Sequence, residues 1–186
     1  SVRDLLLTGS GPITGPTGAL SPITSYEQQL VAPAEASQEV PEHQVWFWLL
    51  HDDSAPERDC LEQLLTAATN ARSVGIVGPK QVGWDNPELL LEVGLRATAS
   101  ARRANDIVPG EVDQGQHDDR SDVLAVGTAG ALIDRAVWEE VGGIAPWLGP
   151  FGDGLELSRA ARLAGYRVIV EPTAVIRHRR ASYQGL

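Results

Sequence analysis

From residue 45 onward, short apolar runs alternate with segments whose apolar residues recur at helical spacing, and this alternation limits the folds open to the chain. The apolar runs have the length and the residue types of buried strands, and the run at 45–50 is expected to be buried on both faces. The predicted strands are 45–50, 74–79, 89–95, 166–172 and a last short one at 174–178. Such an order of strands and helices predicts an α/β sheet covered by helices.

The helices between these strands carry start and stop signals. Ser54–Glu57 has the pattern of a capping box with proline in the first turn, and it predicts a helix that runs through residue 68. Asp134 is expected to cap a second helix, which should end at Gly142-Gly143. A third helix should end at Gly165. We expect positive φ angles at these glycines, because only glycine adopts them without strain.

The composition changes near residue 44. Residues 8–41 are rich in Gly, Pro, Ser and Thr and lack periodicity. We therefore predict an irregular or truncated N-terminal segment over 1–44 and a folded domain over 45–186. The alternative is a loop that folds over a ligand, although the sequence TGSGPITGPTG lacks the Lys-Ser/Thr ending of a phosphate-binding loop.

The charge balance excludes one class of partner. The 186 residues include 15 Lys and Arg against 25 Asp and Glu, which gives a formal net charge of −10. Nucleic acids and anionic membranes bind basic surfaces, so neither is expected as a main partner.

The single cysteine, Cys60, cannot form an internal disulfide, and it is expected to be a packing residue in a reducing, cytoplasmic compartment. No apolar run approaches the roughly 20 residues that a membrane-spanning helix needs. The start at Ser1 and the absence of Met favour a piece of a longer protein. Association with the inner face of the cell membrane would therefore depend on regions outside this chain.

Two acidic residues, Asp52 and Asp53, follow directly after the predicted strand at 45–50. Open α/β sheets bind ligands at the carboxyl ends of their strands. Paired carboxylates in that place could hold Mg²⁺ or Mn²⁺ on a diphosphate. The alternative is that one aspartate caps the helix and the other is solvated.

Three further residues could carry chemistry near the C-terminus. Asp153 and Glu156 are three positions apart at the start of the last long helix, and either carboxylate could act as a general base. They could instead only favour the helix dipole. His178 closes the last predicted strand, where it could ligate a metal or pair with phosphate, although a lone histidine more often does neither.

Several segments taken together are similar to the second half of a family 2 glycosyltransferase of the GT-A fold. These segments are the strand and acidic turn at 45–53, VGTAGALIDRAVWEEVGG at 126–143, the Gly-Asp turn with its helix at 152–165, and AGYRVIVEPTAVIRH at 164–178. The resemblance implies a mixed, mostly parallel sheet flanked by helices. It also implies a nucleotide-sugar donor, a glycan or lipid-linked acceptor and a divalent metal, Mn or Mg.

The resemblance assigns roles to particular residues. The family's acidic triplet corresponds to His51-Asp52-Asp53, so its first carboxylate is replaced by histidine. The resemblance implies that Asp53 contacts the metal and the donor diphosphate, with Asp52 beside it. His178 corresponds to a terminal histidine that is often near the metal.

Two departures from the family pattern bear on activity. The family's Glu-Asp-x-Asp motif falls on residues 153–156, which places Gly154 at the position of the catalytic base. Asp153 or Glu156 would have to replace it. The family's first strand–helix units, which hold the nucleotide base, find no match in residues 1–44.

The leading hypothesis is an inverting glycosyltransferase in glycan or cell-envelope synthesis. The alternative is a catalytically weak, glycosyltransferase-like binding domain, which Gly154 and the unmatched N-terminus favour. A nucleotidyltransferase ranks last, because residues 4–25 contain no Lys or Arg for a basic, glycine-rich signature.

Overall fold

The computed structural model describes residues 44–70, 72–100, 102–145 and 152–180. The irregular segment predicted over 1–44 lies outside these residues except for Gln44. The described residues all belong to one unit, residues 41–186.

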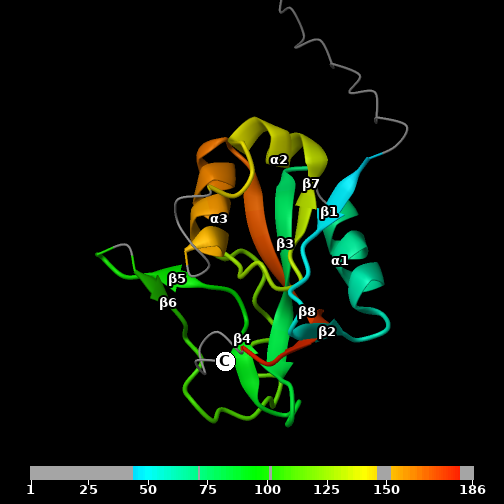
Figure 1. The fold of residues 1–186 in the computed structure, drawn as a ribbon, viewed down its shortest axis with the longest axis vertical. Helices are drawn as coiled ribbons and strands as arrows, with labels where there is room; N and C mark the ends of the chain where they lie inside the picture. Colours follow the sequence, from blue (N-terminus) through cyan, green and yellow to red (C-terminus); the bar gives the residue numbers. More distant parts are fainter. Residues whose placement is uncertain (1–43, 71, 101, 146–151, 181–186) are drawn as a thin grey trace, which may run out of the picture. The chain divides into compact units, whose positions relative to one another are not determined.

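The centre of this unit is a mixed sheet with the strand order β1-β7-β3-β8-β2, in which β4 also pairs with β3 (Figure 1). Its strands are β1 (Trp46–Trp48), β2 (Ser54–Pro56), β3 (Val74–Gly83), β4 (Leu90–Glu92), β7 (Leu132–Asp134) and β8 (Arg167–His178). A separate hairpin consists of β5 (Arg96–Ala97) and β6 (Arg103–Ala104). The helices are α1 (Cys60–Thr69), α2 (Arg135–Val141) and α3 (Asp153–Leu163).

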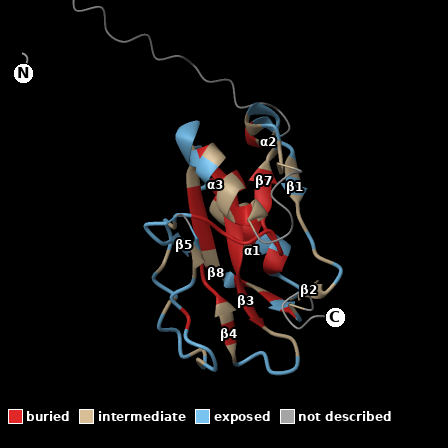
Figure 2. Ribbon diagram, turned by 60° about the vertical axis from the view of Figure 1, so that its left-hand side comes forward, coloured by how far each residue is buried: buried red, intermediate tan, exposed pale blue. Residues whose placement is uncertain are grey.

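Helices cover both faces of the sheet. Neighbouring residues of a strand point to opposite faces, so adjacent residues of β3 pack against different helices. On β3, Val77 packs in a cluster with Leu64 of α1, whereas Ile76 packs in another cluster with Val137 of α2 and Leu157 of α3. Figure 1 shows α1 on one side of the sheet and α3 on the other, and Figure 2 shows β3 as buried along most of its length. The α/β prediction is therefore confirmed.

Local signals correctly predicted the start of α2 and the C-terminal ends of α2 and α3. Asp134 caps α2, and its carboxylate accepts a hydrogen bond of 2.7 Å from the backbone N–H of Ala136. Gly142, Gly143 and Gly165 have φ angles of 79°, 70° and 95°. All three glycines adopt the left-handed conformation that ends a helix.

The predicted capping box at Ser54–Glu57 is wrong. Residues 54–56 form β2, and the Ser54 hydroxyl accepts from the backbone N–H of His51 and donates to its carbonyl. The helix begins later, at Cys60, after Asp59. Pairing with β8 satisfies the backbone of this segment in an extended conformation, so a tertiary contact overrides the local helix signal.

The boundaries of other strands also differ from expectation. The run at 45–50 forms only the short β1, at one end of the described sheet, and Phe47 is 37 % exposed, so it is not buried on both faces. Pro79 does not end the strand at 74–79. The register shifts between Pro79, which pairs with Glu171, and Lys80, which pairs with Val175, and β3 continues to Gly83. On the β8 side, this shift lies between the two last predicted strands, which form the single strand β8.

The sheet is mixed, as expected, but its described pairings are mostly antiparallel rather than mostly parallel. β3 and β8 run parallel, whereas β1–β7, β3–β7, β3–β4 and β2–β8 are antiparallel. For β3 and β4, the short connection explains the antiparallel pairing. β4 follows β3 after the turn at 84–89, and so short a connection can join only antiparallel neighbours.

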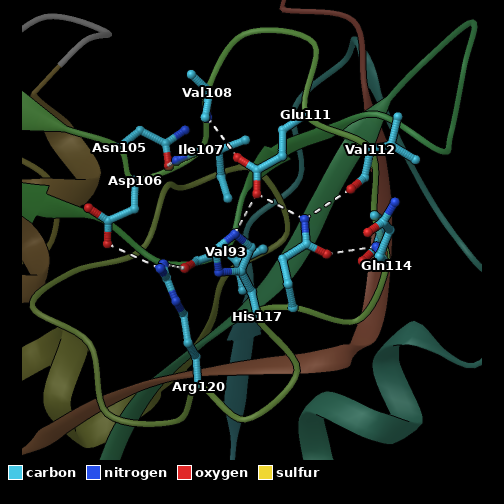
Figure 3. A network of polar contacts seen from close by, with 12 residues as sticks. Val93, Asn105, Asp106, Ile107, Val108, Glu111, Val112, Gln114, His117 and Arg120 are labelled. Atoms are coloured by element: carbon cyan, nitrogen blue, oxygen red, sulfur yellow. Dashed lines mark hydrogen bonds and ion pairs between the residues drawn. The ribbon is translucent and has the colours of Figure 1, made fainter.

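The acidic loop at 109–122 contains no helix and no named strand, but polar contacts attach it to the rest of the domain. Lys80 of β3 is only 5 % exposed and donates to Asp113 at 2.9 Å and to Asp118 at 2.6 Å. Hydrogen bonds from the Val108 N–H, Gln116 and His117 lower the pKa of Glu111 to about 2 (Figure 3). The loop is therefore attached to the sheet by a buried cation.

Cys60 is fully buried at the start of α1, and burial, with help from Asp59 and Glu57, raises its pKa to about 12. A thiol in this state is a poor nucleophile, which agrees with its predicted packing role.

Replacing Gly165 should show the energetic cost of its conformation. A Cβ at this position meets no atom within 4 Å, so the penalty comes from the φ of 95° alone. We expect Gly165→Ala to lower the free energy of unfolding by about 1 kcal/mol. Gly165→Asn should cost less, because asparagine tolerates the left-handed region better. Urea denaturation of both variants measures the difference, and equal stabilities would contradict it.

Acid should weaken the attachment of the 109–122 loop to the sheet. Partial burial opposes the shift, but the ammonium of Lys80 holds the pKa of Asp113 below its ordinary value. A carboxyl with a lowered folded-state pKa stabilises the fold above its ordinary pKa, and this contribution is lost as the pH falls through the folded-state pKa. The free energy of unfolding should therefore fall as the pH drops below the ordinary pKa of aspartate, and less steeply in Lys80→Met.

The control for this prediction is Arg135→Met, which removes an exposed pair with Glu139. Exposed pairs contribute little, so this variant should keep the wild-type acid profile. An acid profile in Lys80→Met as steep as that of the wild-type chain would contradict the role given to Lys80.

Candidate functional site

Strand pairing brings the end of β8 against the turn that follows β1. Ser54 of β2 pairs with His178 of β8, and the backbone N–H of Arg179 donates to the Asp53 carbonyl at 3.0 Å. This places the side chain of Asp53 beside His178, with 3.1 Å between Asp53 Oδ1 and His178 Nε2. His51 Nδ1 lies 4.0 Å from the same Asp53 oxygen. Two imidazoles therefore flank one carboxylate.

Among the described residues, His51, Asp53 and His178 offer ligand atoms that could bind one metal ion. One ligand atom from each lies within 4.8 Å of the other two. Two imidazole nitrogens and one carboxylate oxygen are a donor set that divalent transition metals such as Mn²⁺ accept. The histidine rings contact each other edge to face, with centroids 5.2 Å apart. The residues present therefore fit a divalent cation.

Each histidine has a hydrogen-bond partner on the ring nitrogen that does not face Asp53. His178 is 8 % exposed, and its Nδ1 lies 3.1 Å from Oε1 of the buried Gln81. Burial lowers the pKa of His178, and His51 and Arg180 act in the same direction against the attraction of Asp53. The neutral imidazole that a metal requires is therefore favoured.

On the other side of the site, His51 Nε2 lies 2.9 Å from the Thr128 hydroxyl. That hydroxyl donates to Asp153 Oδ2 at 3.0 Å, and the Gly154 N–H donates to the other oxygen of Asp153. A chain of hydrogen bonds thus connects the N-terminus of α3 to the histidine–aspartate group.

The loop that carries Thr128 is packed closely by small residues. The Gly127 N–H donates to the buried Glu92 carboxylate at 2.6 Å, and the Val126 N–H donates to Ser158 Oγ of α3 at 3.2 Å. A Cβ at Gly154 would lie 2.5 Å from the Val126 carbonyl oxygen. No side chain fits at position 154 unless this loop moves.

The structure brings some of the predicted site residues together and separates others. Asp53 and His178 are in contact, and Asp153 joins them through Thr128 and His51. Asp52 is exposed and lies outside the metal-binding group. Glu156 points to Arg159 of its own helix, whose hydrogen bonds lower the pKa of Glu156.

Sequence reasoning gave no role to His51, Thr128 or Gln81. His51 had a usable signal, because it occupies the first position of the acidic triplet and imidazole is itself a metal ligand. Thr128 and Gln81 carry no signal in the sequence, since their partners lie 77 and 97 positions away.

A pocket of about 420 Å³ adjoins the site, and His178 forms part of its wall together with Trp84, Asp85 and Arg179. The Arg179 guanidinium lies over the Trp84 ring, 4.7 Å from the centroid. An aromatic and charged pocket beside a cation site can receive a polar substrate.

Comparison with solved structures identifies the class of fold. The crystal structure titled "Crystal structure of GalNAc-T7 with UDP, GalNAc and Mn2+" matches with a TM-score of 0.54 at 15 % sequence identity. The match covers 72 % of this chain and 27 % of that one, so the chain spans about a quarter of the matched protein. The fold is that of a GT-A glycosyltransferase.

The sequence model described as Glycosyltransferase like family 2 matches residues 23–186, and the chain belongs to this family. No curated protein matches the chain. Among the described residues, no helix combines the length and the apolar character needed to cross a membrane.

Removing the carboxylate between the two histidines should strongly weaken cation binding. We expect Asp53→Asn to weaken Mn²⁺ binding by roughly 100-fold or more, since the variant removes the charged ligand of the group. Asp52→Asn is the matched control and should bind Mn²⁺ nearly as the wild-type chain does, because Asp52 lies outside the group. Calorimetric titration with MnCl₂ measures both, and an equal loss in the two variants would count against this geometry.

Proposed function

We propose that the chain is the catalytic part of an inverting glycosyltransferase, which transfers a sugar from a nucleotide-sugar donor to a hydroxyl of a glycan or lipid-linked acceptor. The observation that carries this proposal is the His51–Asp53–His178 group in a chain of glycosyltransferase family 2. The matched crystal structure, whose title names UDP, GalNAc and Mn²⁺, supports a nucleotide-sugar donor and a divalent metal.

In this proposal, His51, Asp53 and His178 would hold a divalent cation, Mn²⁺ or Mg²⁺. When bound, the cation supplies positive charge that stabilises the departing nucleoside diphosphate. This local charge matters because the chain as a whole is strongly acidic. Asp52 is exposed beside the group, so its contact with the donor stays a prediction.

Inverting transfer by single displacement needs a base that removes the proton of the acceptor hydroxyl. Position 154 cannot supply it, because glycine has no side chain and the loop leaves no room for one. Glu156 is weakened as a base by its pairing with Arg159. We therefore assign the base to Asp153, whose carboxylate lies on the same side of α3 as Thr128.

The cellular role belongs to the same proposal. Acceptors that are glycans or lipid-linked sugars would place the reaction in cell-envelope synthesis, on the cytoplasmic face of the membrane. Association with the membrane would then come through regions outside this chain, and nucleic acid would not be a partner.

A second candidate function rests on Gly154. A family 2 domain without a side chain at the expected base position could bind a nucleotide-sugar or a glycan without transferring it. The same His51–Asp53–His178 group would then serve binding alone.

One experiment separates the two functions. The chain is incubated with a panel of nucleotide-sugars, with and without Mn²⁺, and both binding and hydrolysis are measured. Mn²⁺-dependent release of nucleoside diphosphate supports the transferase. Binding without turnover supports the binding domain, and the absence of both with every donor would contradict the two proposals together.

The base assignment predicts different results for two neighbouring carboxylates. Asp153→Asn should lower the transfer rate by roughly 100-fold or more while donor affinity is kept, because a base acts on the reaction step and not on binding. Glu156→Gln should retain most of the activity. Steady-state kinetics with the best donor gives kcat and KM for each variant, and a greater loss in Glu156→Gln would reverse the assignment.

A further inference from the structure

We propose that Gln81 is a positioning residue that determines which ring nitrogen of His178 carries the proton, and so keeps Nε2 of His178 open for the cation. The inference rests on the proposed function, because it concerns the same cation site. It assigns a role to a buried side chain that has no other part in the mechanism.

Gln81 is held in place by the strand pairing. It lies two residues before Gly83, which pairs with His178 in the parallel β3–β8 ladder, so both side chains lie on the same face of the sheet. Gln81 is 2 % exposed, so its amide is shielded from bulk solvent. Both ends of the amide are bonded within the protein.

The orientation of the Gln81 amide follows from its partners. The amide nitrogen donates to the Ala129 carbonyl at 3.3 Å, and a carbonyl can only accept. The amide oxygen must therefore face His178 Nδ1, 3.1 Å away, and it too can only accept. His178 then carries its proton on Nδ1, and Nε2 has a free lone pair.

This tautomer works against the direct contact with Asp53. The Nε2 lone pair faces Asp53 Oδ1 at 3.1 Å, so two acceptors meet at hydrogen-bonding distance. Without Gln81, the carboxylate would favour the other tautomer, in which Nε2–H donates to Asp53. That proton would occupy the position between the two ligand atoms that a cation needs.

The second histidine shows the same arrangement. The Thr128 hydroxyl donates its single proton to Asp153, so it can only accept from His51 Nε2–H. His51 Nδ1 is then the unprotonated nitrogen, and this atom faces Asp53 Oδ1 at 4.0 Å. Both histidines thus direct a lone pair at the same carboxylate oxygen.

Two substitutions at position 81 test the proposal. Gln81→Leu removes the acceptor for His178 Nδ1. Gln81→Glu is the matched control, because a protonated Glu at this position can donate to the Ala129 carbonyl and accept from Nδ1–H, as Gln81 does. Circular dichroism and thermal unfolding establish that each variant is folded.

The first measurement uses the metal-free protein. The ¹⁵N chemical shifts of the histidine side chains, recorded at a pH where His178 is neutral, report the tautomer. We expect the proton on Nδ1 of His178 in the wild-type chain and in Gln81→Glu, and on Nε2 in Gln81→Leu. A proton on Nε2 in the wild-type chain, or an unchanged tautomer in Gln81→Leu, overturns the proposal.

The second measurement is calorimetric titration with MnCl₂. Loss of a residue that orients a metal ligand lowers affinity by about 10–100-fold, and we expect a loss of this size in Gln81→Leu but not in Gln81→Glu. Equal affinities in the two variants overturn the role of Gln81 in cation binding. If the wild-type chain shows the expected tautomer and binds no cation, the proposed function fails while the tautomer assignment stands.

Discussion

The site depends on the position of β8 between two other strands. β8 pairs with β3 in parallel and with β2 antiparallel, and these two ladders together align His178 with Gly83 on one side and with Ser54 on the other. A slip of one residue in either ladder would turn His178 to the opposite face of the sheet. Backbone hydrogen bonds between elements far apart in the sequence therefore determine whether the histidine meets Asp53 at all.

Predictions that depend on local chemistry agree with the structure, and those that a tertiary contact can override do not. Gly142, Gly143 and Gly165 end their helices because the left-handed conformation favours glycine, whatever surrounds it. The segment at 54–56 has a good helix-start sequence but is extended, because the edge of β8 binds its backbone. The continuation of β3 beyond Pro79 could not be predicted from the sequence either, since it depends on the irregular pairing with β8.

The candidate site could be predicted only in part for a related reason. Asp53 and His178 stand out through the resemblance to a family, which encodes their proximity although they lie 125 positions apart. Thr128 and Gln81 are ordinary residues until the fold places one behind each histidine. Hydrogen-bond partners of this kind leave no pattern in a single sequence, because many polar side chains could occupy their positions.

The close contact between Gly154 and the loop at 126–128 also constrains how the protein could change in evolution. Introducing an aspartate at position 154 would force its Cβ into the Val126 carbonyl, so the substitution requires a compensating shift in the loop that carries Thr128. Such a shift would also disturb the Thr128 hydroxyl that contacts His51 Nε2. Position 154 is therefore coupled to this loop, and a side chain there needs a second change that moves the backbone of Val126.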